Sequence, residues 1–150
     1  MIEITLKRVE GDYGFEATDQ QGHVIKTDSG IANGGADFGA RPMQLLLMAL
    51  GACAGIDIVS ILQKQRQVID GLDMSIKGER EAGKEPSLWQ SIHISFELAG
   101  QLDEEKVKKA CALSMDKYCS VAETLRRAGA QITWNAQVRS GAVFSGEGIS

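Results

Sequence analysis

The N-terminal part of the chain alternates between apolar and polar positions in three short stretches. These stretches cover residues 2–9, 13–18 and 23–27, and glycine-containing turns separate them. A two-residue period places successive side chains on opposite faces of a strand, so the pattern predicts three strands in an antiparallel meander. Residues 28–40 contain four glycines and have no period, which predicts a loop.

A long apolar segment follows this loop. Pro42 suits the first position of a helix, where its missing N–H removes no hydrogen bond. From there to residue 62, apolar side chains surround the helix axis almost completely, and a helix that is apolar on every side is a core helix. Gly51 and Gly55 lie four residues apart and would let another backbone approach closely. The segment therefore predicts a long, buried central helix.

Three further strands are predicted after this helix. Residues 71–77 and 91–98 alternate, and a polar connection at 79–86 joins them. Alternation returns in residues 130–139, which predicts a last strand. Residues 141–150 are small and rich in Gly and Ser, so we expect them to form a loose tail.

Two helices are predicted before the last strand. Asp103 precedes two glutamates, a pattern typical of an N-cap followed by acidic first-turn residues, and this helix is expected to run to about residue 117. Ser120 and Glu123 have the spacing of a capping box, so a short helix is expected to start at Ser120 and to end before Gly129.

Size, composition and charge limit the possible functions. A chain of 150 residues can form one domain with its own core, and we assign residues 1–140 to it. Its content of 43% apolar and 24% charged residues is ordinary for a soluble globular protein. The net charge of −4 argues against a nucleic-acid partner, because counterion release needs clustered Lys and Arg.

The N-terminus alternates like a strand and lacks the basic-then-apolar order of a signal peptide. No uninterrupted apolar run reaches the roughly 18 residues that span a bilayer. We therefore expect a cytoplasmic protein with no membrane segment. In that compartment the three cysteines indicate free or catalytic thiols rather than a disulfide scaffold.

The surroundings of each cysteine determine whether it can react, because the thiolate is the reactive form. Cys119 directly precedes Ser120, so the N–H groups and the dipole of the short helix would favour its thiolate. The alternative is a small apolar residue that anchors the helix entry. Cys53 lies among Leu, Ala and Gly, and plain core packing is its alternative. Cys111 lies on the apolar face of an amphipathic helix and is interpreted as packing.

Asp57 follows Cys53 by four residues, so both project from one face of the long helix. A carboxylate there needs a partner or contact with water. This face is therefore predicted to line a polar cleft or interface, with a buried salt bridge as the alternative. A carboxylate would also disfavour the Cys53 thiolate, so a nearby cation is required. Arg41 heads the same helix and is a candidate; a solvated side chain is the alternative.

Other chemistries have little support in the sequence. There is no C-x-x-C or H-E-x-x-H motif, and the two histidines, His23 and His93, fall in unrelated strands. The glycine-rich loop has neither P-loop nor Rossmann spacing. We therefore expect no metal and no cofactor.

Two segments together resemble a known family. Residues 41–53 read RPMQLLLMALGAC and residues 118–125 read YCSVAETL. This pair, in this order, resembles the OsmC/Ohr family of thiol-dependent hydroperoxide reductases, and the order of elements over residues 1–140 agrees. The resemblance implies an α+β, OsmC-like fold with an antiparallel sheet and a long central buried helix. It also implies an intertwined homodimer with active sites at the subunit interface.

The resemblance further implies a redox role for two cysteines. Cys53 matches the cysteine that attacks the peroxide O–O bond and becomes a sulfenic acid. Cys119 matches the cysteine that condenses with it to a disulfide, which an external dithiol then reduces.

One position departs from the specialised peroxidases, in which the motif proline precedes a Glu that pairs with an Arg near the reactive cysteine. Here Met43 follows Pro42, and Gln44 agrees with the motif. Gln44, Arg41 and Asp57 are therefore possible activating or binding residues. The chain looks like the divergent OsmC-like branch of the family.

Two main functions compete at this point. The first is a peroxidase that reduces organic hydroperoxides or hydrogen peroxide through Cys53 and Cys119. The second is a homodimer that binds a small apolar or acyl ligand, with thiols that are vestigial or used for sensing; a purely structural role is a third. Retention of both cysteines favours the first function, and Met43 favours the second.

Overall fold

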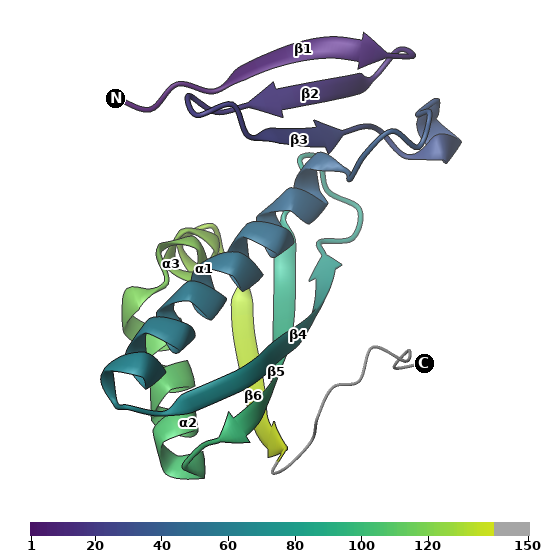
Figure 1. The fold of residues 1–150 in the computed structure, drawn as a ribbon. Helices are drawn as coiled ribbons and strands as arrows, with labels where there is room; N and C mark the ends of the chain where they lie inside the picture. Colours follow the sequence, from purple (N-terminus) through teal and green to yellow (C-terminus); the bar gives the residue numbers. More distant parts are fainter. Residues whose placement is uncertain (140–150) are drawn as a thin grey trace. The chain divides into compact units, whose positions relative to one another are not determined.

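The computed structural model describes residues 1–139 of the chain (Figure 1). The predicted tail, residues 141–150, lies outside the described residues. The chain divides into two compact units, Met1–Met48 and Ala49–Ser150, and each is described by itself.

The first unit contains the predicted meander. Strands β1 (Thr5–Glu10), β2 (Gly14–Thr18) and β3 (Val24–Thr27) form an antiparallel sheet in the order β1-β2-β3. This confirms the three strands that the alternation predicts. The glycine-rich segment after β3 is a loop with one short 3₁₀ helix, η1 (Ile31–Asn33).

A buried carboxylate holds this loop together. Asp28 is 2% exposed, and its oxygens accept backbone N–H groups of Ser29 at 2.7 Å, Ala36 at 2.9 Å and Phe38 at 3.1 Å. Backbone donors buried in a loop need partners. The side chain of Asp28 therefore provides the hydrogen-bond acceptors that a neighbouring strand would provide in a sheet.

Helix α1 (Pro42–Lys64) begins in the first unit and continues through the second. At its start the side chain of Gln44 accepts the backbone N–H of Arg41 at 3.1 Å, one half of a capping box. Six residues face the core of the chain: Leu50, Gly51, Ala54, Gly55, Ile58 and Leu62.

Burial of α1 is one-sided in the single chain. The side chain of Ile56 is 70% exposed, so the expected burial on every side is only partly met. Within the described part of the chain, α1 is the one helix long and apolar enough to cross a membrane. Core helices of soluble proteins pass the same test, so the absence of a membrane segment stays a prediction.

The second unit is built on a three-stranded sheet in the order β4-β5-β6. Strands β4 (Val68–Arg80) and β5 (Trp89–Gln101) pair antiparallel, whereas β5 and β6 (Gln131–Arg139) pair parallel. The expectation of an antiparallel sheet is therefore wrong for this pair. The chain between β5 and β6 forms a helical crossover. This crossover brings the chain back to the end of the sheet where β5 begins, so that β6 can run parallel to β5.

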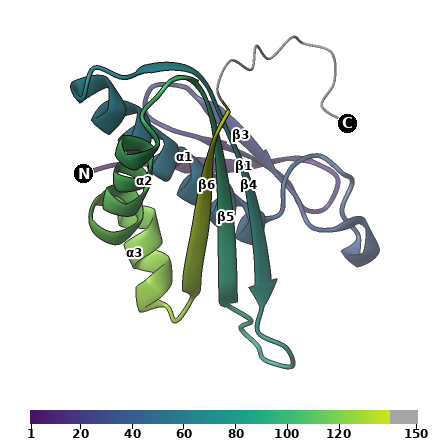
Figure 2. The same ribbon diagram turned by 90° about the horizontal axis from the view of Figure 1, so that it is seen from below.

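One face of this sheet is apolar and carries the helices. Ile92, Ile94, Phe96 and Leu98 of β5 are buried, and α2 and α3 lie along β6 on that side (Figure 2). A Cβ atom on Gly51 would lie 2.8 Å from Ile76 of β4. The two helix glycines thus make room for β4 side chains rather than for the backbone that the sequence predicts, because the nearest atoms belong to the side chains of Ile76 and Met74.

The crossover contains three helical segments. Helix α2 (Glu104–Leu113) has Asp103 as its N-cap, as predicted, and Asp103 accepts the N–H of Glu105 at 2.9 Å. The α-helix ends at Leu113 and continues as a π-helical turn, η2 (Ser114–Tyr118). Helix α3 (Ser120–Arg127) follows.

The N-cap of α3 differs from the prediction. It is Cys119 rather than Ser120, because the backbone is still extended at Cys119 and already helical at the next residue. Gly129, at φ 103°, lies just beyond the helix end, which confirms the predicted stop.

Candidate functional site

Three chemically active side chains meet in the second unit. The sulfurs of Cys53 and Cys119 and a carboxylate oxygen of Asp57 all lie within 4.8 Å of one another. Cys53 and Asp57 are half-buried, and Cys119 is 3% exposed. The condition set by the sequence, that the fold should bring the two cysteines together, is met.

Helix α1 points the side chains of Cys53 and Asp57 in the same direction. They lie one helical turn apart, and each directly precedes a residue that is 0% exposed, Ala54 and Ile58. These two anchors fix the rotation of the helix against the core. Cys53 and Asp57 consequently lie at the border of the buried face rather than at its centre.

Cys119 is held by the turn that precedes it. Its backbone N–H donates to the carbonyl of Ser114 at 2.8 Å, which closes the π-helical turn. Its sulfur accepts the N–H of Ala122 at 3.4 Å. The guanidinium of Arg126 donates to the carbonyl of Met115, which ties the turn to α3.

Ser114 is a site residue that sequence reasoning missed. It is 0% exposed, and its hydroxyl donates to Asp57 Oδ2 at 2.9 Å. Asp57 forms no ion pair within residues 1–139, so the salt-bridge alternative is wrong there. One signal was available: Ser114 continues the buried positions Val107 and Cys111 of α2, and a polar residue in that series needs a partner.

Burial decides the protonation of Cys119. The pKa of this thiol is raised to about 11, chiefly by burial and to a smaller extent by the nearby Cys53 thiol, while the Ala122 N–H acts in the opposite direction. The N–H groups at the start of α3 do favour the Cys119 thiolate, as expected, but burial has the larger effect and the pKa is raised. Near neutral pH, Cys119 is a protonated thiol.

Cys111 is not a member of the cluster that Cys53, Asp57 and Cys119 form. It is 0% exposed, and burial raises the pKa of its thiol to about 12. The interpretation of Cys111 as packing is confirmed.

Arg41 and Gln44 make local contacts in the first unit. The Nε atom of Arg41 lies 3.0 Å from where a Cβ atom of Gly30 would stand, and Gln44 caps the start of α1. Any activating role for Arg41 or Gln44 stays a prediction.

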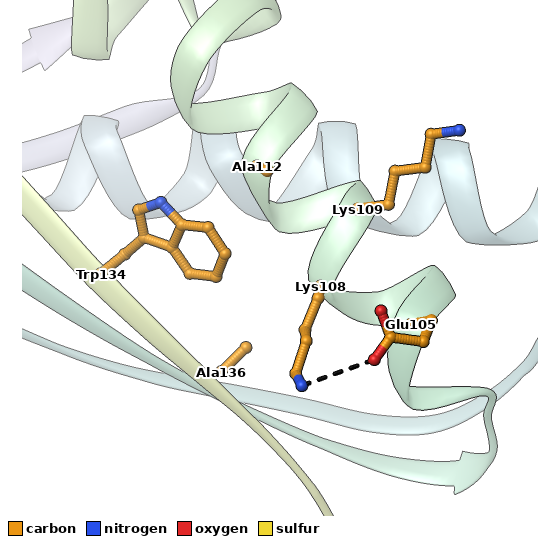
Figure 3. A pocket seen from close by; sticks show the side chains of 6 residues that line it. All are labelled: Glu105, Lys108, Lys109, Ala112, Trp134 and Ala136. Atoms are coloured by element: carbon orange, nitrogen blue, oxygen red, sulfur yellow. Dashed lines mark ion pairs between the residues drawn. The ribbon is translucent and has the colours of Figure 1, made fainter.

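Two surface pockets differ in their chemistry. The pocket beside Cys119 has a volume of about 350 Å³, and Lys117, Tyr118 and Arg127 form part of its rim. A second pocket lies between α2 and β6 (Figure 3), with a volume of about 590 Å³ and an ion pair between Lys108 and Glu105 at 3.6 Å. Of these two pockets, the first is the one that Cys119 lines.

Comparisons with known proteins determine the family. The sequence profile described as "OsmC-like protein" matches residues 34–135. Protein YhfA of Escherichia coli K12 is 38% identical over 128 residues, which cover 85% of this chain and 91% of YhfA. The chain belongs to the OsmC-like protein family. The recognition made from the two cysteine motifs is thereby confirmed.

Solved structures agree with this assignment. A hypothetical protein from Aquifex aeolicus VF5 superposes with a TM-score of 0.77 at 28% identity, over 93% of this chain and 98% of that one. An organic hydroperoxide resistance protein OsmC from Legionella pneumophila gives a TM-score of 0.69 at 16% identity, over 92% and 97%. The second likeness shows the fold alone. The protein thus has an α+β, OsmC-like fold.

Proposed function

We propose that the protein is a thiol-dependent peroxidase that reduces organic hydroperoxides or hydrogen peroxide through Cys53 and Cys119. The observation that carries this proposal is the approach of the two sulfurs to within 4.8 Å. A disulfide needs its sulfurs about 2.05 Å apart, a gap that small side-chain and backbone movements can close. A protein of the same fold bears the name organic hydroperoxide resistance protein, so organic hydroperoxides are the first substrates to test.

In the first step, Cys53 is the nucleophile. It is half-exposed, whereas Cys119 is buried and protonated. Asp57 lies within 4.8 Å of the Cys53 sulfur, a distance that one bridging water spans, and it takes the proton of the thiol through that water as a general base. The thiolate attacks one peroxide oxygen, the O–O bond breaks, and the departing alkoxide or hydroxide takes up a proton. Cys53 becomes a sulfenic acid and the peroxide becomes an alcohol or water.

In the second step, Cys119 resolves the sulfenic acid. The Cys119 sulfur attacks the Cys53 sulfur, a disulfide forms, and the sulfenic oxygen leaves as water with the Cys119 proton. An external dithiol then restores both thiols by two exchanges and becomes a disulfide itself. The pocket beside Cys119 is the expected approach of this reductant.

The working form is proposed to be a cytoplasmic homodimer. Ile56 exposes an apolar side chain on α1, and an apolar helix with an uncovered side is typical of an interface. Light scattering at micromolar concentration tests this proposal, and a monomeric mass would contradict it.

Substitution of Cys53 tests the enzymatic proposal. Cys53→Ser should abolish peroxide consumption, because a hydroxyl is a far weaker nucleophile than a thiolate. Stopped-flow measurements with cumene hydroperoxide and hydrogen peroxide provide the readout, and Cys111→Ser is the matched control. If Cys53→Ser keeps the wild-type rate while Cys111→Ser loses it, the assignment of roles is wrong.

A second candidate function rests on an apolar pocket in the first unit. Leu6, Tyr13, Phe15 and Pro42 line part of this pocket, which has a volume of about 400 Å³. A pocket of this kind fits a small apolar or acyl ligand. Ligand binding becomes the better account if peroxide leaves all three thiols of the native protein unmodified and a fluorescent fatty acid binds.

A further inference from the structure

The Cys53–Asp57–Cys119 cluster also has the donors of a metal site. Two sulfurs and one carboxylate oxygen converge within 4.8 Å of one another. Tetrahedral zinc, with bonds of about 2.3 Å to sulfur and about 2.0–2.2 Å to oxygen, places its donors roughly 3.5–3.8 Å apart. Contraction of the cluster by about 1 Å gives this geometry, less movement than disulfide formation requires.

The donor types narrow the choice of metal. Soft thiolate sulfurs make up two of the three donors, which disfavours Mg²⁺ and Ca²⁺ because these cations take oxygen ligands. Zinc accepts both cysteine sulfur and carboxylate oxygen. Three protein donors would leave the fourth position to water, as in zinc sites that exchange ligands.

Neighbouring groups already orient two of the donors. The Ser114 hydroxyl donates to Asp57 Oδ2, which leaves the other carboxylate oxygen for a metal. The Ala122 N–H donates to the Cys119 sulfur and would stabilise it as a thiolate. Hydrogen bonds of this kind orient ligands in protein metal sites.

The charge that the cluster would carry with both thiols ionised also suits a divalent cation. Asp57 is half-buried and has no ion pair in the part of the chain that the structure describes. When both thiols ionise, three negative charges lie together, and a divalent cation offsets two of them. The three donors lie at positions 53, 57 and 119, so they form no short sequence motif of the C-x-x-C or H-E-x-x-H kind.

We infer that the reduced protein binds one zinc-class divalent cation through Cys53, Asp57 and Cys119. Binding releases two thiol protons, and the Asp57 carboxylate completes the set. This inference goes beyond the proposed function. One consequence does rest on that function: bound zinc would occupy both redox thiols and inhibit peroxide reduction, while the Cys53–Cys119 disulfide would exclude zinc.

A zinc titration tests the site without any peroxide. Reduced, untagged full-length protein should take up one zinc per chain in competition with a chromophoric chelator. Cys53→Ser and Cys119→Ser should lose this binding. Ser114→Ala should weaken it by roughly 10–100-fold, the usual cost of removing a group that orients a ligand. Cys111→Ser is the matched control and should bind like the wild type.

Two measurements on the unmutated protein complete the test. Cobalt(II) should give a thiolate-to-metal charge-transfer band that disappears when zinc is added. Zinc should also protect Cys53, the half-exposed thiol of the pair, from iodoacetamide, as read by peptide mass mapping. No zinc uptake, or uptake that survives both cysteine substitutions, overturns the inference. Peroxidase assays in a chelator are separate, so zinc binding without peroxide reduction would reject the proposed function alone.

Discussion

Two carboxylates of this protein, Asp28 and Asp57, have opposite surroundings. Asp28 accepts three backbone N–H groups, whereas the one hydrogen-bond donor to Asp57 within residues 1–139 is the hydroxyl of Ser114. Backbone N–H groups do not titrate, and these three are fixed in the loop. They occupy the carboxylate of Asp28, whose role is to stabilise that loop. Asp57 keeps an oxygen available beside two thiols. The number of fixed donors therefore distinguishes a structural carboxylate from a chemically available one.

The Asp28 pKa reflects its surroundings. Burial alone would raise the pKa, but the N–H groups of Ala36, Phe38 and Ser29 outweigh it and lower the pKa below its ordinary value. Asp28 is thus ionised at every pH at which the protein is expected to work.

The largest expected effect is at the reactive region. Cys119→Ser should leave the first turnover of peroxide intact but abolish cycling with a dithiol, and excess peroxide should drive Cys53 to sulfinic acid. In the wild type, one equivalent of peroxide should give a Cys53–Cys119 disulfide with Cys111 free. Peptide mass mapping distinguishes these products. Sustained cycling of Cys119→Ser would remove Cys119 from the resolving step.

The next largest effect is expected from substitution of Asp57 itself. Asp57→Asn keeps a similar shape but removes the base, so the rate of peroxide reduction should fall by roughly a hundredfold. Ser114→Ala keeps the carboxylate and should cost less. Stopped-flow rates and urea unfolding measured on both variants separate chemistry from stability. An Asp57→Asn protein as fast as the wild type would show that the carboxylate takes no part.

A smaller effect concerns alkaline pH. The folded-state pKa values of about 11 for Cys119 and about 12 for Cys111 lie above the ordinary value of about 8.5. The folded protein therefore holds these protons longer than the unfolded chain. Their contribution to stability is complete below about pH 8.5 and is lost as pH rises through the folded values. The urea midpoint of the reduced protein should fall over this range, and less steeply in Cys111→Ala.

The smallest effect is expected at Asp28. Because its folded pKa is lowered, its contribution to stability is present above the unfolded value and is lost as pH falls below about 4. Asp28→Asn should lower the urea midpoint at neutral pH and flatten its dependence on acid. The rate of peroxide reduction per folded molecule should stay the same. If Asp28→Asn lowered the rate of peroxide reduction more than Asp57→Asn does, Asp28 rather than Asp57 would be the carboxylate that takes part in the chemistry.

Much of this fold could be predicted from local sequence. Alternation located the strands, and the uninterrupted apolar segment after Pro42 located α1. The parallel pairing of β5 with β6 was not predictable in this way, because alternation shows which side chains share a face but not which strand lies beside which. The resemblance to a family implied an antiparallel sheet, so it did not supply this pairing either.

The site was predictable only in part. The spacing of Cys53 and Asp57 puts them on one face of any helix, so that part follows from the sequence. Ser114 contacts Asp57 across 57 positions of sequence, and no local pattern encodes such a contact. The protonation of Cys119 also needed the structure, because its burial outweighs the effect of the helix N-terminus that the sequence shows.

The π-helical turn at Ser114–Tyr118 has a consequence for insertions and deletions in this family. A π turn contains one residue more than an α-helical turn, and here that extra residue separates the end of α2 from Cys119. Each residue of an α-helix turns the chain by about 100°. Deletion of a single residue such as Asp116 would therefore rotate Cys119 by about that angle while leaving both cysteines in the sequence. Aligned homologues that keep both thiols but lack this residue should form no disulfide.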